Sequence, residues 1–324
     1  IGIRGMVIIQ LAGGLGNQMF QYALYLQLKS QGRTVKIDDV SGFVEDRQRE
    51  PALGAFGITY ERASRPELEA MLDCSPQLRH KIRRKLCGRK KKAYFEEDKR
   101  YKPAVLTWDD IYLEGYWQTE KYFQTVTGQV KDTLDPDRLL AAEAKACGIG
   151  GSRSTSAPAS YKAAHDAGGR TLAWWLEQAA ATESVSVHIR RGDYLLPENQ
   201  ALFGGICTED YYRAAMARMQ KMHPGCVFYL FTNDKQWAGE WADRGQIEPV
   251  ALTDVPDSGM GRDYPEFLLM SRCRHYILSN SSFSWWACYM NKNPHKTVLA
   301  PDRWLNGWDC EDFYRADMQK VTAG

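Results

Sequence analysis

Residues 7–37 read VIIQLAGGLGNQMFQYALYLQLKSQGRTVKI, and this stretch decides the fold class. Val7–Leu11 is rich in β-branched residues and predicts a strand, which ends at residues 12–14, Ala-Gly-Gly. The apolar residues that follow recur at helical spacing, at Met19, Tyr22, Ala23 and Leu26, and Gly32 ends the pattern. Residues 34–37 predict a second strand. A strand, a helix and a strand in this order predict a parallel sheet, so the expected fold class is α/β.

A second alternation of strands and helices follows a small, polar segment. This segment, GIGGSRSTSAPAS at residues 148–160, has the composition of a linker. Beyond it we expect helices over residues 172–181, 208–222, 235–243 and 266–273 and after Ser281, and strands over 185–189, 227–231, 249–252, 275–278 and 297–299. The sequence therefore predicts two α/β domains, residues 6–152 and 153–324. Ligands of such sheets bind at the carboxyl ends of the strands.

The composition excludes several classes of protein. The 324 residues include 42 Lys+Arg and 40 Asp+Glu, a balance that argues against a nucleic-acid-binding protein. The sequence holds no run of 18 apolar residues and opens without a signal peptide, so we expect a cytoplasmic protein. The eight cysteines form no CxxC pair and show no metal-ligand spacing, so we expect reduced thiols and no metal site.

The turn after the first expected strand is the first candidate ligand loop. Gly14-x-Gly16 after a strand, with Asp38 farther along, partly fits a dinucleotide-binding fingerprint. Met19 occupies the position of the third glycine, which weakens the interpretation as a nicotinamide-dependent oxidoreductase. Two hypotheses remain: a turn that brings backbone N–H groups and the Asn17 and Gln18 amides to a polar ligand, or a tight turn without a ligand.

The second candidate loop follows the strand expected over residues 185–189. Arg190 and Arg191 lie where a parallel strand ends, and guanidinium groups bind phosphate oxygens through paired hydrogen bonds. Gly192 permits a turn, and Asp193 is suited either to orient an arginine or to accept a proton. A structural Arg–Asp surface pair is the alternative. His188 lies inside the strand, where a core histidine and a catalytic histidine are equally expected.

The third candidate is the segment SNSSFSWW at residues 279–286, where a strand gives way to a helix. Ser281 or Ser282 is suited to cap this helix, whose amino end would bind a phosphate. Ordinary helix capping without a ligand is the alternative hypothesis.

A basic run extends from Arg79 to Lys92 and holds nine Lys and Arg in fourteen residues. A solvated surface hairpin or loop is the simplest interpretation. The alternative is peripheral contact with anionic membrane lipid, or with a lipid-linked pyrophosphate.

Six segments together resemble the bacterial α-1,2-fucosyltransferases of glycosyltransferase family 11. They are GGLGNQMFQYA (13–23), GYWQTEKYF (115–123), VHIRRGDYL (187–195), GGICTEDYY (204–212), FTNDKQW (231–237) and SNSSFSWWA (279–287). The resemblance implies a GT-B fold, with two Rossmann-like domains facing each other across a cleft. It also implies GDP-β-L-fucose as donor, no metal or other cofactor, and inverting transfer to the 2-hydroxyl of a terminal galactose in an oligosaccharide, such as a lipopolysaccharide unit.

The resemblance also suggests roles for individual residues. Arg190 resembles the arginine that holds the donor β-phosphate, and Arg191 resembles its neighbour in the donor pocket. The other expected donor-binding residues come from the two remaining loops: Asn280, Ser281, Ser282, Gly14, Gly16, Asn17 and Gln18. Asp193 is our first candidate for the catalytic base and His188 the second. The oxidoreductase, and a carbohydrate-binding protein without catalysis, are the competing functions.

Overall fold

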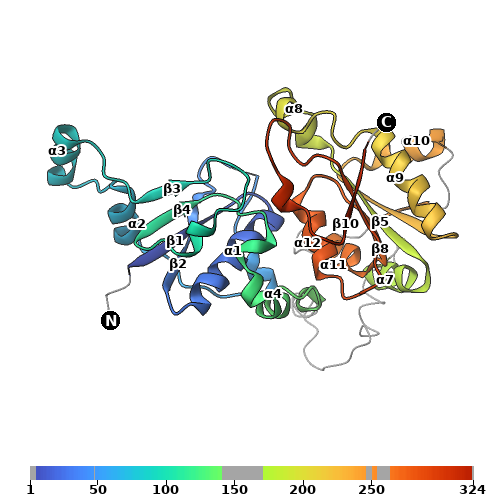
Figure 1. The fold of residues 1–324 in the computed structure, drawn as a ribbon, viewed down its shortest axis with the longest axis horizontal. Coiled ribbons are helices and arrows are strands. Elements are labelled where there is room, and N and C mark those ends of the chain that lie inside the picture. The colour runs from blue at the N-terminus through green and yellow to red at the C-terminus, as the bar shows by residue number, and fades with distance from the viewer. Residues whose placement is uncertain (1–4, 47, 141–170, 246–249, 254–262, 323–324) are drawn as a thin grey trace. The chain divides into compact units, whose positions relative to one another are not determined.

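The computed structural model describes residues 5–46, 48–140, 171–245, 250–253 and 263–322. The chain divides into an N-terminal unit, Ile1–Leu134 with Glu311–Phe313, and a C-terminal unit, Asp135–Cys310 with Tyr314–Gly324. The expected linker lies outside the described residues, so the domain limits 6–152 and 153–324 stay a prediction. Each unit has its own parallel sheet with helices packed against it, which confirms the predicted α/β class (Figure 1).

The N-terminal sheet has the strand order β2-β1-β4-β3, and all neighbours are parallel. Its strands are β1 (Met6–Ala12), β2 (Thr34–Gly42), β3 (Ala93–Phe95) and β4 (Ile111–Glu114). The unit's α-helices are α1 (Leu15–Ser30), α2 (Arg65–Leu72), α3 (Leu78–Cys87) and α4 (Thr127–Thr133). Short 3-10 helices are Leu53–Phe56, Pro103–Leu106, Glu120–Tyr122, Gln124–Val126 and Glu311–Phe313. The first strand, helix and second strand predicted from the sequence are confirmed.

The tight turn between β1 and α1 requires glycine at position 13. Gly13 has a φ of +73°, and a Cβ there would stand 2.6 Å from Nδ2 of Asn17. Gly32, with a φ of +70°, follows the end of α1, as the sequence pattern predicted.

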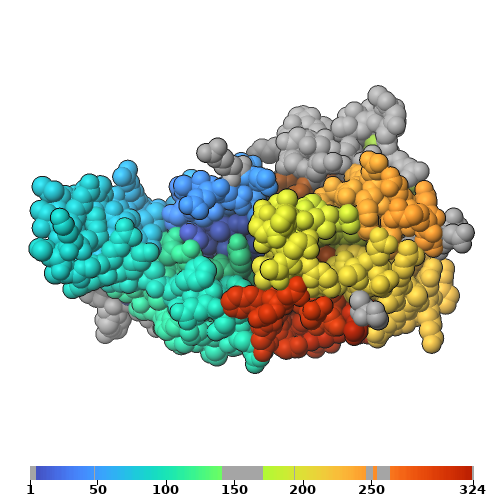
Figure 2. Space-filling model, turned by 90° about the horizontal axis from the view of Figure 1, so that it is seen from above, coloured from blue at the N-terminus to red at the C-terminus, as the bar shows by residue number. Residues whose placement is uncertain are grey.

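The prediction of a hairpin or loop over the basic run was wrong. Residues 78–87 form helix α3, which Gly88 ends with a φ of +72°. Leu78, Ile82 and Leu86 recur every four residues, but the surrounding basic residues hid this helical period. In Figure 1, α3 stands apart from the sheet of its unit, and the cyan surface of Figure 2 includes this segment.

The C-terminal sheet has the strand order β10-β9-β8-β5-β6-β7, again with parallel neighbours. Its strands are β5 (Ser184–Ile189), β6 (Val227–Thr232), β7 (Val250–Leu252), β8 (His275–Ile277), β9 (Val298–Pro301) and β10 (Met318–Val321). Its helices are α7 (Leu172–Ala181), α8 (Pro197–Phe203), α9 (Glu209–Met222), α10 (Lys235–Gly245), α11 (Asp263–Arg272) and α12 (Ser282–Met290). A 3-10 turn covers Gly192–Leu195. The predicted strands and helices of this unit are confirmed, whereas α8 and β10 were not predicted.

The central strand β5 is buried along its whole length. Val185, Val187 and Ile189 pack in one core cluster with Tyr211 and Trp241, which come from α9 and α10. β5 reads SVSVHI, so its apolar residues alternate with two serines and a histidine, and this period-2 alternation makes the strand recognisable from sequence.

The order of the strands places a topological switch point in each sheet. From β5 the chain adds β6 and β7 on one side, and then crosses to add β8, β9 and β10 on the other. The switch point of the C-terminal unit therefore lies between β5 and β8. In the N-terminal unit it lies between β1 and β4. Ligands of open α/β sheets bind at the carboxyl ends of the strands beside such points.

Within the described residues, the structure has no helix with the length and apolar character needed to cross a membrane.

Candidate active site

The candidate site lies at the carboxyl ends of β5 and β8, beside the switch point. β5 runs into Arg190 and Arg191, and β8 runs through Ser279 and Asn280 into α12. The two strands are direct neighbours, with Val187 paired to Ile277. The structure therefore brings together the second and third candidate segments of the sequence.

Arg191 is held firmly in the loop after β5. Its Nε donates a hydrogen bond to Oδ2 of Asp234 at 3.1 Å, and its guanidinium carbon lies 3.9 Å from the centroid of the Trp237 ring. Asp234 also accepts a hydrogen bond from the Trp237 backbone N–H at 3.1 Å, at the start of α10. Arg191 therefore fixes the loop against the next strand and helix.

The backbone of the same loop fits closely against Asn233. Oδ1 of Asn233 accepts a hydrogen bond from the Arg191 N–H at 3.0 Å. Gly192 has a φ of +53°, and a Cβ at this position would stand 2.3 Å from Nδ2 of Asn233. The site therefore requires glycine at position 192 for conformation and for space.

Arg190 has an aromatic neighbour in Tyr194. The Arg190 guanidinium carbon lies 5.6 Å from the centroid of the Tyr194 ring. Tyr194 donates a hydrogen bond to the Asn280 carbonyl at 3.1 Å and stacks on Phe203 at 4.1 Å. Tyr194 thus links the loop after β5 to the loop after β8. The side chain of Asp193 lies outside the described structure, so its role as base stays a prediction.

His188 is buried at the end of β5, with 7 % of its surface exposed. Its Nδ1 forms a hydrogen bond with Oγ of Ser279 at 2.7 Å. Burial, together with the positive charge of Arg190, lowers the pKa of His188 to about 3. A base that acts near neutral pH needs a pKa near neutral, so this environment disfavours His188 as the catalytic base.

The amino end of α12 is the second part of the site. Oγ of Ser281 accepts a hydrogen bond from the Phe283 N–H at 3.3 Å and caps the helix. Ser282 is the first residue of the helix. The side-chain amide of Asn280 donates to the Trp304 carbonyl at 3.0 Å and accepts from Sγ of Cys207 at 3.4 Å. The Asn280 amide therefore connects loops, whereas the helix end offers N–H groups and a positive dipole for an anion.

Two tyrosines missed by the sequence reasoning hold this edge of the sheet in place. Tyr211 donates its hydroxyl to the Leu278 carbonyl at 2.5 Å, and Tyr212 donates to the His188 carbonyl at 2.9 Å. Both hydroxyls come from α9 and reach the two strands that flank the switch point. The adjacent tyrosines in GGICTEDYY were the available signal, but their partners lie far away in sequence.

In the loop between β1 and α1 of the N-terminal unit, the side-chain amides of Gln18 and Asn17 form hydrogen bonds within the unit itself. Gln18 donates to the carbonyls of Gly13 and Glu50 at 2.8 and 2.9 Å, and accepts from the Ala52 N–H at 2.8 Å. Gln18 is 1 % exposed, so its amide holds the loop together. Asn17 accepts a hydrogen bond from Nε2 of Gln118 at 2.6 Å.

The two remaining glycines of this loop have different positions. Gly14 is the N-cap of α1, and Gly16 is buried in its first turn. No finding tests donor binding by Gly14, Gly16, Asn17 or Gln18, so this role stays a prediction.

Asp38 lacks the exposure that the dinucleotide hypothesis requires. It is 1 % exposed, and its Oδ1 accepts hydrogen bonds from the Val40 and Ser41 N–H groups at 3.1 and 3.0 Å. Its Oδ2 accepts the Tyr112 hydroxyl at 2.7 Å. A ribose would have to displace these partners, which argues against a nicotinamide dinucleotide at this loop.

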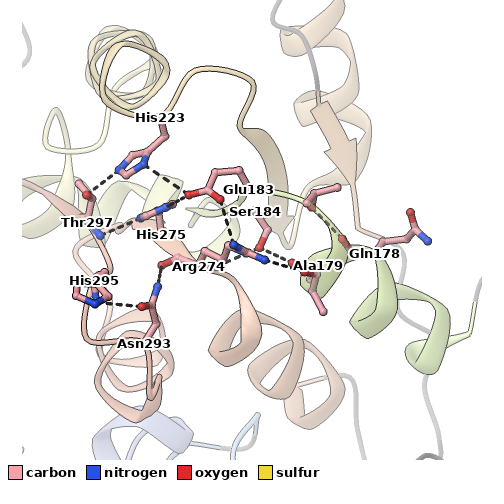
Figure 3. Close-up of polar contacts among 12 residues, drawn as sticks. Gln178, Ala179, Glu183, Ser184, His223, Arg274, His275, Asn293, His295 and Thr297 are labelled. Carbon is pink, nitrogen blue, oxygen red and sulfur yellow. Dashed lines mark hydrogen bonds and ion pairs between the residues drawn. The ribbon is translucent and has the colours of Figure 1, made fainter.

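A cluster of two histidines and a glutamate lies at the opposite edge of the C-terminal sheet, at the amino ends of its strands (Figure 3). The candidate ligand atoms of Glu183, His223 and His275 lie within 4.8 Å of one another, which is compatible with a metal ion. The two imidazole rings stack with their centroids 3.6 Å apart.

The hydrogen bonds of His275 argue against a metal ion in this cluster. Nδ1 of His275 accepts a hydrogen bond from the Thr297 N–H at 3.0 Å, so the hydrogen of the neutral ring lies on Nε2. Nε2 meets Oε1 of Glu183 at 2.6 Å, and this hydrogen bond lowers the pKa of Glu183. A metal bound at Nε2 would leave the hydrogen of the neutral ring on Nδ1. Nδ1 could then no longer accept the Thr297 N–H, and two hydrogens would face each other. The cluster is therefore arranged as a hydrogen-bond network.

Comparison with known proteins shows that the C-terminal unit is similar to a family of glycosyltransferases. Residues 170–316 match the model of the family described as "Glycosyl transferase family 11". The chain is 27 % identical to the O-antigen biosynthesis glycosyltransferase WbnK of Escherichia coli, over 92 % of this chain and 94 % of that protein. It is 25 % identical to an α-1,2-colitosyltransferase of Escherichia coli, over 95 % of each chain.

Two further matches are more limited. The human galactoside α-(1,2)-fucosyltransferase 1 is 33 % identical over 33 % of this chain and 28 % of its own length. Among solved structures, an Arabidopsis thaliana FUT1 mutant in complex with GDP aligns with a TM-score of 0.44 and 12 % identity, over 90 % of this chain and 69 % of that chain.

Proposed function

We propose that this glycosyltransferase transfers L-fucose from GDP-β-L-fucose to the 2-hydroxyl of a terminal galactose, because its residues 170–316 match the model of glycosyl transferase family 11. The observation that carries the proposal is the placement of Arg190 next to the loop that begins α12, at the switch point of the matched unit. The names of the relatives support it, since one is a galactoside α-(1,2)-fucosyltransferase and another an α-1,2-colitosyltransferase.

In the proposed reaction, the bond between the fucosyl carbon and the β-phosphate oxygen breaks, and its electron pair leaves with GDP. Arg190 and the amino end of α12 stabilise the negative charge that develops on this phosphate. A preorganised donor of this kind contributes about 3–4 kcal/mol to stabilisation of the transition state. Arg191, fixed by Asp234 and Trp237, keeps the loop that carries Arg190 in place.

The acceptor hydroxyl attacks the fucosyl carbon from the face opposite GDP, which inverts the configuration. In our proposal the Asp193 carboxylate accepts the hydroxyl proton as the new C–O bond forms. Asp193 lies three residues after Arg190 in the same loop. The low pKa of His188 makes the imidazole a weaker base, so we prefer Asp193.

The proposal needs no metal cofactor, because Arg190 and the helix dipole supply the positive charge that the diphosphate requires. The acceptor we propose is a galactose-terminated oligosaccharide of the kind found in O-antigen units, as the name of the WbnK relative indicates.

The test is mass spectrometry of lactose incubated with the protein and GDP-fucose, with EDTA present throughout. We expect lactose to gain one deoxyhexose and linkage analysis to place it on the 2-hydroxyl of galactose. Release of GDP without modified lactose would support the donor and reject this acceptor. A parallel reaction with GDP-colitose tests the donor, because colitose is L-fucose without its 3-hydroxyl. Transfer of colitose alone would contradict the proposed donor.

A further inference from the structure

Helix α3 presents an apolar face to solvent. Leu78, Ile82 and Leu86 are 72 %, 51 % and 78 % exposed, and none of the helix's ten residues is buried. They lie four residues apart, so they form one stripe about 12 Å long on one side of the helix. Helices on globular proteins normally turn such a stripe toward the core.

The opposite face attaches α3 to its unit. Nη2 of Arg84 donates a hydrogen bond to the Ser75 carbonyl at 2.8 Å, and the Arg84 side chain is 14 % exposed. Arg83 forms an ion pair with Asp73, which also accepts a hydrogen bond from the Lys90 N–H at 2.8 Å. The helix is therefore held by its polar side, and this orientation directs the apolar stripe outward.

Basic side chains border the apolar stripe. Helical spacing places Lys81 and Lys85 along one border and Arg79 along the other. The run from Arg79 to Lys92 contains nine Lys and Arg and no acidic residue. Within the described parts of the chain, Lys81 and Lys85 make no ion pair. The combination of apolar stripe and positive borders is typical of helices that lie in the surface of anionic membranes.

We propose that α3, with the basic segment that follows it to Lys92, docks on an anionic lipid surface. The apolar stripe enters the boundary between head groups and acyl chains, while the basic borders contact lipid phosphates. Nucleic acid or a soluble polyphosphate would match the charge but would leave the three apolar side chains in water. The proposal concerns where the protein binds and does not depend on the sugar that it transfers.

The test is sedimentation of the full chain with sucrose-loaded vesicles. One set contains phosphatidylglycerol and phosphatidylcholine in equal amounts, and the other contains phosphatidylcholine alone. The variant Leu78→Ser/Leu86→Ser removes apolar surface without removing core contacts, because both side chains are more than two thirds exposed. Its matched control is Val40→Ser/Val44→Ser, at positions in the same unit that are 64 % and 70 % exposed.

We expect the wild type and the valine control to sediment with phosphatidylglycerol vesicles and not with phosphatidylcholine alone. Leu78→Ser/Leu86→Ser should weaken binding by at least about tenfold. Lys81→Gln/Lys85→Gln should weaken it by about fivefold for each lysine.

Equal binding to both vesicles, or no sedimentation with phosphatidylglycerol, would overturn the proposal. Unchanged binding of the leucine variant would also overturn it, because the contact would then be electrostatic, as with nucleic acid. Thermal unfolding of each variant by circular dichroism confirms that the fold is intact.

Discussion

Gly192 and Asn233 fit together so closely that a Cβ on Gly192 would stand 2.3 Å from Nδ2 of Asn233. The same asparagine accepts the Arg191 N–H at 3.0 Å. The contact therefore connects the loop after β5 to the end of β6. It fixes the conformation of the loop and, with it, the position of Arg190.

We predict that Gly192→Ala lowers kcat by about 10- to 100-fold, because Asn233 must move and the loop moves with it. The positive φ adds a backbone cost of about 1–2 kcal/mol. Gly205→Ala is the matched control, since Gly205 has a φ of +68° and nothing within 4 Å of its Cβ position. Steady-state kinetics and thermal unfolding of both variants make the comparison. Equal loss of kcat in both would mean that the Asn233 contact is unimportant for catalysis.

Arg190→Lys should lower kcat by about 100-fold with little change in the affinity for GDP-fucose. Lysine keeps the charge but loses the paired hydrogen bonds that guanidinium offers a phosphate, and loss of such a donor costs about 3 kcal/mol in the transition state. The control is Arg218→Lys, on the exposed surface of α9, where Arg218 bonds to the Lys320 carbonyl at 3.5 Å. Turnover like that of the wild type in Arg190→Lys would remove Arg190 from the leaving-group role.

The sequence predicted those elements whose burial leaves a pattern in the chain. β5 and β6 are buried almost throughout. β6 reads VFYLFT, a nearly continuous apolar run, and β5 reads SVSVHI, in which apolar and polar residues alternate. β10 is an edge strand with two exposed residues among four, and its residues, MQKV, carry no such pattern. Helix α3 was missed because its three apolar residues face water and stand among nine basic ones.

The candidate site, like the fold, was predictable only where a local sequence pattern marks its residues. Arg190 and the start of α12 were predictable, because parallel strands end at a common edge. The contact of Gly192 with Asn233 and the hydrogen bond of His188 to Ser279 join residues distant in sequence. They depend on β5 lying between β6 and β8, and strand order cannot be read from local pattern.

The network of Glu183, His223 and His275 leads to a prediction about metal binding. Zn²⁺ should not raise the melting temperature at pH 7.5, and EDTA should not lower it, because the Thr297 N–H occupies Nδ1 of His275. Isothermal titration calorimetry with Zn²⁺ provides the direct measurement. A tight site with one equivalent of Zn²⁺, abolished by His275→Gln and retained by His295→Gln, would show that this network is a metal centre.

His188 should make the protein sensitive to acid well above the pH at which its carboxylates protonate. In the folded state its pKa is about 3, whereas the ordinary value is 6.5, so the unfolded chain binds the proton more readily between these limits. The stability that neutral His188 contributes is complete above pH 6.5 and is lost as the pH falls toward 3. Between pH 7.5 and 5 the expected loss in the free energy of unfolding is about 2 kcal/mol.

Urea unfolding at pH 7.5, 6.5 and 5 measures this loss, and His188→Gln isolates the contribution of the histidine. Glutamine fills a similar volume without titrating, so the difference in unfolding free energy between variant and wild type should shrink by about 2 kcal/mol as the pH falls to 5. His295→Gln, at an exposed histidine, controls for general effects of removing an imidazole. A pH dependence that is the same for wild type and His188→Gln would mean that the pKa of His188 in the folded protein is close to its ordinary value of 6.5. With a pKa that close to neutral pH, the imidazole would compete with Asp193 for the role of catalytic base.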